Sequence, residues 1–292
     1  MVNINNNSNT ESQNLENVPK KFPDGHFYSP LVNIDEVKQG ENRIWSEKPE
    51  VLGIDFNEAS HKFLLSEVFP SYISDYDYPL NDRGEANYYN DNSQFSWLDS
   101  RTLFVILRHL RPKRMIEIGS GFSSLLTADI NRRFLNSQLE FTCIEPYPRN
   151  FLLTGIPGIS HLIQSKVQDV PLSSLTNLQS GDILFIDSSH VCKTGSDVNH
   201  IYFEILPRLP AGVFIHIHDI FLPYEYPKHW VIDDFRSWNE QYLLRALLMY
   251  TQAFEVIFGC NFAFQKYPEL VRKILNGELY GGGSLWLRKI VD

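Results

Sequence analysis

The chain has 292 residues, of which 43% are hydrophobic, with a formal net charge of −9 and a pI of about 5.5. This length suffices for one large domain with a substantial core, and the hydrophobic content excludes a wholly disordered chain. The acidic balance argues against a protein that binds nucleic-acid phosphates, so we expect no nucleic-acid partner.

The cysteines and the hydropathy pattern predict the compartment. Cys143, Cys192 and Cys260 are far apart and show no Cys-x-x-Cys spacing, so we expect neither a disulfide framework nor a cysteine-based zinc site. The N-terminus has no apolar signal core, and no run of about 18 apolar residues occurs. We therefore predict a cytoplasmic protein that does not cross or bind a membrane.

The N-terminal third is expected to precede the main domain. Residues 1–20 are rich in Asn, Ser, Glu and Gln and predict a disordered tail. Residues 21–98 are predicted to form a cap or lid region, with a helix over 57–73. Within this region, segment 72–97 concentrates tyrosines and other aromatic residues. Two interpretations stay open for it, a loop packed onto the core by its rings or a lid over a substrate pocket.

From residue 97 onward, short apolar strands alternate with helices. The first helix is expected over 97–112, with Asp99 or Ser100 as its N-cap. Five strand segments then follow, in RMIEIGS, EFTCIEPYP, SHLIQSKVQDVP, GDILFIDSSH and GVFIHIHDI. After a long helix in DDFRSWNEQYLLRALLMY, two more segments are strand-like, FEVIFGCNFAFQ and GGGSLWLRKIV. This order predicts an α/β fold, a parallel sheet with helices on both faces and an antiparallel last strand.

The stretch MIEIGSGFSS predicts a turn that binds a nucleotide-like cofactor. Gly119 and Gly121 carry no Cβ and let the backbone approach a ligand closely. The next helix is expected to begin at Ser123 or Ser124, whose hydroxyls would cap it. A dinucleotide fingerprint requires a third glycine at the position of Ser124. A serine there suits a ligand without phosphate, and Glu117 inside the turn would attract an ammonium group.

Polar residues after the second and third strands extend this site. Glu145 ends the second strand 24 residues after Gly121, where an acidic residue holds ribose hydroxyls in dinucleotide-binding folds. Gln168 and Asp169 follow the third strand, where an amide and an acceptor can bind an adenine edge. The combined spacing favours a nucleoside site over separate solvated carboxylates.

The fourth and fifth strands end in candidates for the chemistry. Asp187 and His190 follow the fourth strand, and His218 and Asp219 end the fifth. His216 lies deeper in the fifth strand, on the same face as His218, and is expected to be buried and hydrogen-bonded. A histidine at the cleft can take a proton from a substrate hydroxyl. Alternatively, the two aspartates could hold a divalent cation.

Together these motifs resemble those of class I S-adenosylmethionine-dependent methyltransferases, most closely the bacterial group called methyltransferase family 24. The motifs that carry the resemblance are RMIEIGSGFSS, CIEPYP, VQDVP, DILFIDSSH and VFIHIHDIFLPYEYP. The resemblance implies a Rossmann-like seven-stranded sheet with an antiparallel last strand. We therefore predict an S-adenosylmethionine-binding methyltransferase domain over 99–292, preceded by the cap region.

The resemblance also implies roles for individual residues. The expected cofactor-binding residues are Glu117, Gly119, Ser120, Gly121, Ser123, Glu145, Gln168, Asp169 and Asp187. The residues of the first turn would surround the methionine part of the cofactor. Glu145 would bind the ribose, and Gln168 and Asp169 would border the adenine. The reacting methyl would face three catalytic candidates and an acceptor-binding segment, namely His190, His218 and Asp219, and then Tyr224, Glu225 and Tyr226.

We predict an S-adenosylmethionine-dependent O-methyltransferase for a small-molecule, glycan-like or peptide-derived metabolite. The expected general base is His190 or His218, oriented by Asp219. The His218–Asp219 pair departs from the acidic pair of metal-dependent relatives, so we expect no metal. The alternatives are a Mg²⁺-dependent enzyme that uses Asp187 and Asp219, an NAD(P)-dependent oxidoreductase, and a non-catalytic binding protein. The aromatic N-terminal region is a candidate homodimer surface.

Overall fold

The computed structural model describes residues 20–84 and 86–292. They form two compact units, one of Ser46–Tyr226 with Trp238–Asp292, the other of the residues up to Trp45 with Pro227–Ser237. All but the last residue of the predicted tail lies outside the described residues. The predicted boundary at residue 98 does not separate the units, because residues 46–98 belong to the unit that contains the sheet. A capping role for 21–98 stays a prediction.

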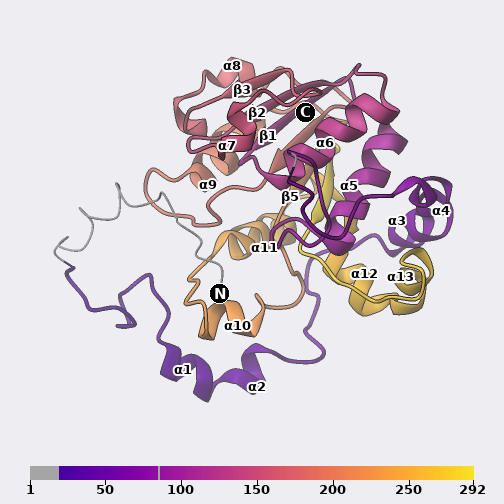
Figure 1. Cartoon of the computed structure of the whole chain (residues 1–292). Helices are drawn as coiled ribbons and strands as arrows, with labels where there is room; N and C mark the ends of the chain where they lie inside the picture. Colours follow the sequence, from indigo (N-terminus) through magenta and orange to yellow (C-terminus); the bar gives the residue numbers. More distant parts are fainter. Residues whose placement is uncertain (1–19, 85) are drawn as a thin grey trace. The chain divides into compact units, whose positions relative to one another are not determined.

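The larger unit is built around a seven-stranded sheet of order β3-β2-β1-β4-β5-β7-β6 (Figure 1). Its strands are β1 (Arg114–Ile118), β2 (Glu140–Ile144), β3 (His161–Ile163), β4 (Ile183–Ile186), β5 (Phe214–Ile217), β6 (Phe254–Gly259) and β7 (Leu285–Lys289). Strands β1 to β5 pair in parallel, and β7 runs antiparallel to both β5 and β6. The predicted Rossmann-like sheet with a reversed last strand is confirmed.

Helices of the larger unit flank this sheet. They are α3 (Glu58–Phe63), α4 (Phe69–Tyr72), α5 (Trp97–Leu110), α6 (Phe122–Phe134), α7 (Asn150–Leu153), α8 (Leu172–Leu175), α9 (Asp197–His200), α11 (Glu240–Tyr250), α12 (Cys260–Lys266) and α13 (Pro268–Ile274). A π-helical turn, Leu64–Val68, joins α3 to α4, and another, Ile201–Ile205, continues α9. The smaller unit contains α1 (Ile34–Gln39), α2 (Glu41–Ile44) and α10 (Lys228–Ile232).

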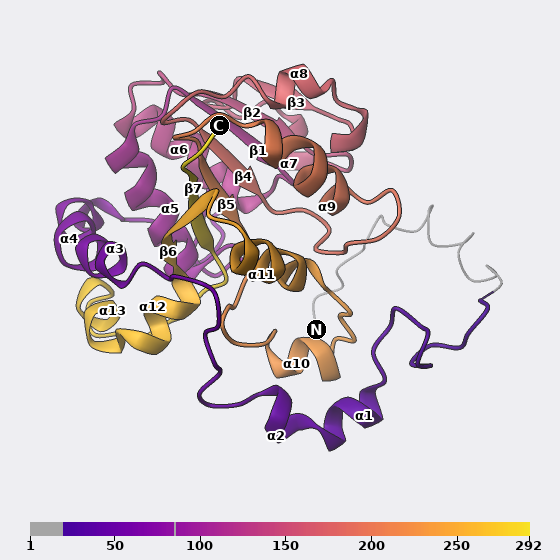
Figure 2. The same ribbon diagram turned by 180° about the vertical axis from the view of Figure 1, so that it is seen from behind.

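Side-chain alternation along the strands divides the core between two faces of the sheet. In β4, Ile183 and Phe185 belong to one face, and Leu184 and Ile186 to the other, as a period of two requires. Helices α5, α6, α12 and α13 cover the first face, while α9 and α11 cover the second. Figure 2 shows α11 beside the β5-β7-β6 end of the sheet. A central strand buried on both sides explains why the segment is continuously apolar.

The aromatic segment 72–97 packs onto the first face of the sheet. Tyr88 and Phe95 are each 2% exposed, and the Tyr78 hydroxyl donates to an Asp129 carboxylate oxygen at 2.8 Å. Rings that are buried and hydrogen-bonded in this way stabilise the loop against the core. These contacts match the interpretation of a packed loop. Gln94 and Phe95 of the same segment line a cavity next to the turn after β1, so the lid stays a prediction.

Two predicted boundaries are wrong. Ser96, rather than Asp99 or Ser100, is the N-cap of α5. The Asp99 carboxylate instead accepts the backbone N–H groups of Gly283 and Ser284, which directly precede β7. The strand predicted in FEVIFGCNFAFQ stops at Gly259, where its pairing with β7 ends, and Cys260 begins α12.

His61 joins α3 to β6 in the protein interior. Its side chain is 0% exposed. Nδ1 lies 3.2 Å from the Asn57 carbonyl oxygen, and Nε2 accepts the Gly259 N–H at 2.8 Å. An accepting Nε2 requires the neutral ring. Burial lowers the pKa of His61 to about 4, although its backbone hydrogen bonds act in the opposite direction.

We expect this histidine to make folding stability depend on pH. In the unfolded chain His61 is protonated below its ordinary pKa of about 6.5, and in the folded protein only below a pKa of about 4. The contribution of His61 to the free energy of unfolding is therefore complete above the unfolded-state pKa. It is lost as the pH falls towards and through the folded-state pKa, and the total loss is about 3 kcal/mol. Urea unfolding at about pH 7 and about pH 4.5 checks this. At about pH 7, His61→Leu should be less stable than the wild type. Its free energy of unfolding should fall less than that of the wild type between the two pH values.

The exposed His161 provides the matched control. His161→Asn should show the wild-type loss of stability between the two pH values. A His61→Leu variant with the same pH dependence as the wild type would contradict the assignment.

Candidate functional site

The turn after β1 lies against the end of β4. Gly119 has φ of +81°, and a Cβ added there would overlap the Asp187 carbonyl oxygen, so only glycine fits. Helix α6 begins directly after Gly121, whose N–H donates to the Ser124 hydroxyl at 3.0 Å. The predicted helix start at Ser123 or Ser124 is therefore wrong, because Ser124 bonds back to the N-cap from within the first turn.

Glu117 lies beneath this turn. The hydroxyls of Ser123 and Ser124 donate to its carboxylate, the first at 2.7 Å, and the Cys143 thiol lies 3.5 Å away. The side chain is 0% exposed, and burial raises the pKa of Glu117 to about 7 despite the two serine hydrogen bonds. The structure thus differs from the expectation of direct cofactor contact, because Glu117 and the Ser123 hydroxyl bind each other.

Two adjoining cavities open at the carboxyl ends of β1, β2 and β4, with volumes of about 530 Å³ and 220 Å³. Both are lined by Gly119, Glu145, Tyr147 and Asp187, so we treat them as one cleft. The predicted cofactor residues that line it are Gly119, Ser120, Gly121, Ser123, Glu145, Gln168 and Asp187. Glu117 and Asp169 do not line it; Asp169 is exposed at the end of a 3₁₀ turn.

Polar atoms at this cleft are available to a ligand. Among residues 20–84 and 86–292, the buried Ser120 Oγ, Gln168 Oε1 and Ser188 Oγ have no hydrogen-bond partner, whereas buried polar atoms are normally paired. Glu145 accepts the N–H groups of Ser120 and Tyr147 at 3.0 Å and 2.8 Å and remains partly exposed. A nucleoside, with several hydroxyl and amine groups, fits this set of donors and acceptors.

Asp187 also belongs to a cluster of charged side chains. Its Oδ1 lies 3.4 Å from both His190 Nε2 and His218 Nδ1. Oxygens of Asp219 lie 3.5 Å from the same two nitrogens. Ligand atoms of Asp187, His218 and Asp219 all lie within 4.8 Å of one another. The structure therefore brings the three predicted catalytic residues together around Asp187.

Each of these histidines faces a further carboxylate through its other ring nitrogen. Glu240, the first residue of α11, places Oε2 3.0 Å from His190 Nδ1. Asp99 in α5 places Oδ2 3.6 Å from His218 Nε2. Sequence reasoning did not find either role. Asp99 was interpreted as a helix cap, and an acidic residue in the first turn of a helix is too common to single out Glu240.

The carboxylates control the charge of the histidines. Burial alone would lower the pKa of both rings, but hydrogen bonds to Asp187 and Glu240 raise the pKa of His190 to about 10. The charges of Asp219 and Asp187 hold the pKa of His218 well above its usual range. Burial would raise the pKa of Asp187, yet the two histidines hold it well below normal, whereas burial raises the pKa of Asp219. Carboxylates outnumber imidazoles, so the cluster suits a cation.

His216 lies in β5, two residues before His218, and is confirmed as a buried, hydrogen-bonded residue. It is 0% exposed, and its Nε2 lies 2.8 Å from the Ser284 hydroxyl. The ring stacks on Phe185 with centroids 3.7 Å apart, and burial holds the pKa of His216 well below its usual range. The ring is therefore neutral, and its centroid lies 5.8 Å from that of His218 in the charged cluster.

The predicted acceptor-binding residues are bonded to α11. The Tyr226 hydroxyl accepts the Gln241 N–H at 3.0 Å, and the Tyr224 carbonyl accepts from the Gln241 side chain at 3.1 Å. Glu225 accepts the Tyr242 hydroxyl at 2.6 Å. None of Tyr224, Glu225 and Tyr226 lines the cleft, and their contact with an acceptor stays a prediction.

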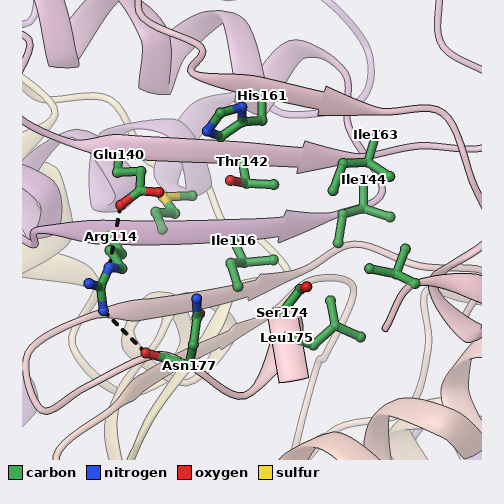
Figure 3. Close-up of a pocket in the computed structure, with 12 residues that line it drawn as sticks. Arg114, Ile116, Glu140, Thr142, Ile144, His161, Ile163, Ser174, Leu175 and Asn177 are labelled. Carbon is green, nitrogen blue, oxygen red and sulfur yellow. Dashed lines mark hydrogen bonds and ion pairs between the residues drawn. The ribbon is translucent and has the colours of Figure 1, made fainter. Parts of the chain in front are cut away.

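A third cavity, of about 200 Å³, lies on the second face of the sheet between β1–β3 and α8 (Figure 3). Its floor is apolar, with side chains of Ile116, Ile144 and Ile163. At one end Arg114 pairs with Glu140 at 3.4 Å. No predicted site residue lines this cavity, so the candidate site is the cleft at the carboxyl ends of the strands.

Comparison with known proteins identifies the class. A family model described as a methyltransferase domain, Methyltransf_24, matches residues 116–220. An uncharacterized protein from Archaeoglobus fulgidus is 42% identical over 172 residues, which make up 57% of this chain and 77% of that protein. The chain belongs to the Methyltransf_24 family of methyltransferase domains, as its motifs predicted. The predicted methyltransferase class is confirmed, and the alternative of an NAD(P)-dependent oxidoreductase has no support.

Solved structures of methyltransferases are also similar. The O-methyltransferase TomG from Streptomyces achromogenes, in complex with SAM, is 13% identical with a TM-score of 0.42, covering 81% of this chain and 97% of that chain. An O-methyltransferase from Bacillus cereus, in complex with SAH, is 14% identical with a TM-score of 0.39, covering 88% of this chain and 100% of that chain.

The remaining predictions concern the environment of the protein. No helix within residues 20–84 and 86–292 combines the length and apolar character needed to cross a membrane. Cys143, Cys192 and Cys260 are free thiols in the structure. The cytoplasmic location and the homodimer stay predictions.

Gly119 provides a test of the close contact in the first turn. Gly119→Ala should lower the free energy of unfolding by at least about 2 kcal/mol, because the methyl group meets backbone and the residue keeps a positive φ. Gly121→Ala is the control, since a Cβ there has no neighbour within 4 Å. Denaturant unfolding of both variants measures the difference, and equal stabilities would contradict the close contact.

Proposed function

We propose that the chain is an S-adenosylmethionine-dependent O-methyltransferase that modifies a hydroxyl group of a small-molecule, glycan-like or peptide-derived acceptor. The observation that carries this proposal is the dual position of Asp187. Asp187 lines the cleft, and its side chain lies 3.4 Å from both His190 and His218. A nucleoside cleft and a proton-binding cluster therefore meet at one carboxylate, which suits methyl transfer to an oxygen.

The cleft has groups that match the cofactor. S-adenosylmethionine would supply a methyl group on a cationic sulfur, transferred in line as the acceptor O–C bond forms and the C–S bond breaks. We assign the ribose hydroxyls to Glu145 and the remaining polar contacts to Ser120 and Gln168, whose buried oxygens lack partners. The low pKa of Asp187 keeps this carboxylate ionised beside the cleft, where it favours a cationic group. Asp169 and Glu117 receive no direct contact in this assignment.

The charged cluster supports oxygen as the acceptor atom. An amine can attack with its free lone pair, whereas a hydroxyl must lose a proton as it is methylated. Burial raises the pKa of Asp219, and this carboxylate lies 3.5 Å from His190 and from His218. Since both rings are protonated at neutral pH, we assign proton acceptance to the coupled histidine–Asp219 group as a whole. These residues would also hold the acceptor oxygen roughly 3 Å from the methyl carbon.

Calorimetric titration with S-adenosylhomocysteine tests the cofactor site. Glu145→Ala removes a charged hydrogen-bond acceptor worth about 1.5–3 kcal/mol, so we expect affinity to fall roughly 10- to 150-fold. Glu140→Ala should bind like the wild type, because Glu140 lies at the opposite end of β2 and pairs with Arg114. Absence of binding by the wild type would refute the proposal, and turnover with any acceptor would exclude a non-catalytic protein.

A second candidate is a cation-dependent form of the same reaction. Asp187, His218 and Asp219 form a donor set that could hold a metal ion, in contrast to the expectation of no metal. When bound, a divalent cation would supply a Lewis acid that lowers the pKa of the acceptor hydroxyl. An imidazole nitrogen among the donors suits Mn²⁺ or a similar transition metal better than Mg²⁺. Asp99, at the outer nitrogen of His218, matches the carboxylates that orient metal-binding histidines.

Thermal unfolding with added metal separates the two forms. For chelator-treated protein, Mn²⁺ at about 100 times its Kd should add about 2.7 kcal/mol to stability, and Mg²⁺ at the same concentration should add less. Asp219→Asn should abolish the shift, while Asp169→Asn, exposed outside the cleft, should keep it. An absent shift in the wild type, or methyl transfer that persists in EDTA, would leave the metal-free form.

A further inference from the structure

The loop that carries His190 is held by the first turn of α11. The His190 carbonyl accepts the N–H groups of both Asn239 and Glu240 at 3.1 Å. Two residues further on, the Cys192 N–H donates to the Asn239 side chain at 2.6 Å. His190 itself has φ of +59°, a conformation that non-glycine residues adopt only when their surroundings impose it. The backbone of His190 is therefore fixed relative to α11.

The side chain of His190 is fixed by the same turn. Glu240 Oε2 lies 3.0 Å from His190 Nδ1, and the indole of Trp238 contacts the ring with centroids 4.4 Å apart. Glu240 is 0% exposed. A buried carboxylate is costly unless it is paired, and His190 is the cationic partner that lies against it. An ionised Glu240 can only accept a hydrogen bond, so a proton on Nδ1 is what pairs the two side chains.

A fixed Nδ1 proton determines what the opposite nitrogen faces. With Nδ1 directed at Glu240, His190 Nε2 lies 3.4 Å from Asp187 and 3.5 Å from Asp219. Rotation of the ring would remove Nε2 from both carboxylates and leave Glu240 unpaired. Glu240 does not line the cleft, so it acts on the reacting groups only through the histidine.

We infer that Glu240 is a positioning residue that holds His190 with Nδ1 protonated and Nε2 directed into the Asp187–Asp219 cluster. This inference rests on the proposed function in one respect only, namely the role of His190 Nε2 in proton transfer. The orientation of the ring is a property of the protein without cofactor, metal or acceptor. It can therefore be tested even if the cofactor assignment fails.

Nitrogen NMR of the full chain labelled with ¹⁵N-histidine tests the inference directly. His190→Gln identifies the His190 signals by their loss. In the wild type, Nδ1 of His190 should resonate in the protonated range with an attached low-field proton. Glu240→Leu should lose that low-field proton signal, and Glu240→Gln, whose side-chain oxygen still accepts, should retain it. A wild-type Nδ1 in the unprotonated range would overturn the inference, whether or not any variant folds.

Two further measurements separate positioning from a general structural role. Glu204→Gln, at an exposed glutamate paired with Arg208, should leave the His190 signals unchanged. S-adenosylhomocysteine affinity should change less than about 3-fold in Glu240→Gln, because the residue lies outside the cleft. A Glu240→Leu spectrum identical to the wild type, in a protein that remains folded, would contradict the positioning role. Loss of S-adenosylhomocysteine binding by the wild type would count against the proposed function alone.

Discussion

Backbone contact between the Gly119 turn and the end of β4 is the constraint on which the site depends. The absence of a side chain at Gly119 lets the Asp187 carbonyl approach the turn, so the strand ends of β1 and β4 meet without a gap. Asp187 then projects beside the cleft, and β5, the next strand of the sheet, brings His218 and Asp219 to it. The candidate cleft and the charged cluster are formed by adjacent strand ends rather than by one long loop.

Much of the fold was predictable because its strands have distinct sequence patterns. Continuous apolar runs such as that of β4 mark strands buried on both faces, and the order of late segments marked the reversed last strand. The end of a strand was predicted wrongly where apolar residues continue beyond the last residue that pairs with the neighbouring strand. Residues after Gly259 are as apolar as β6, yet they form α12, since only contact with β7 distinguishes the two. The local sequence does not indicate where the pairing of β6 with β7 ends.

The site was predictable where it lies at strand ends and not where helices contribute. His190, His218 and Asp219 follow strands, and neighbouring parallel strands must end at the same edge. Glu240 lies 50 residues from His190, and its role depends on how α11 packs against the second face. Glu117 was misplaced for a related reason. Alternation along β1 directs it towards α6, where Ser123 and Ser124 already occupy its oxygens.

The two forms of the proposed reaction differ in which cation balances the same carboxylates. The raised pKa values of His190 and His218 favour protons on both rings, which balance part of the negative charge of these carboxylates. A metal-bound imidazole must give up the proton of its inner nitrogen, but it keeps the proton of the outer one. The outer carboxylates Glu240 and Asp99 therefore support either form equally. Asp187 and Asp219 distinguish the two forms, because these two carboxylates lie against the inner nitrogens, where a proton and a metal ion compete.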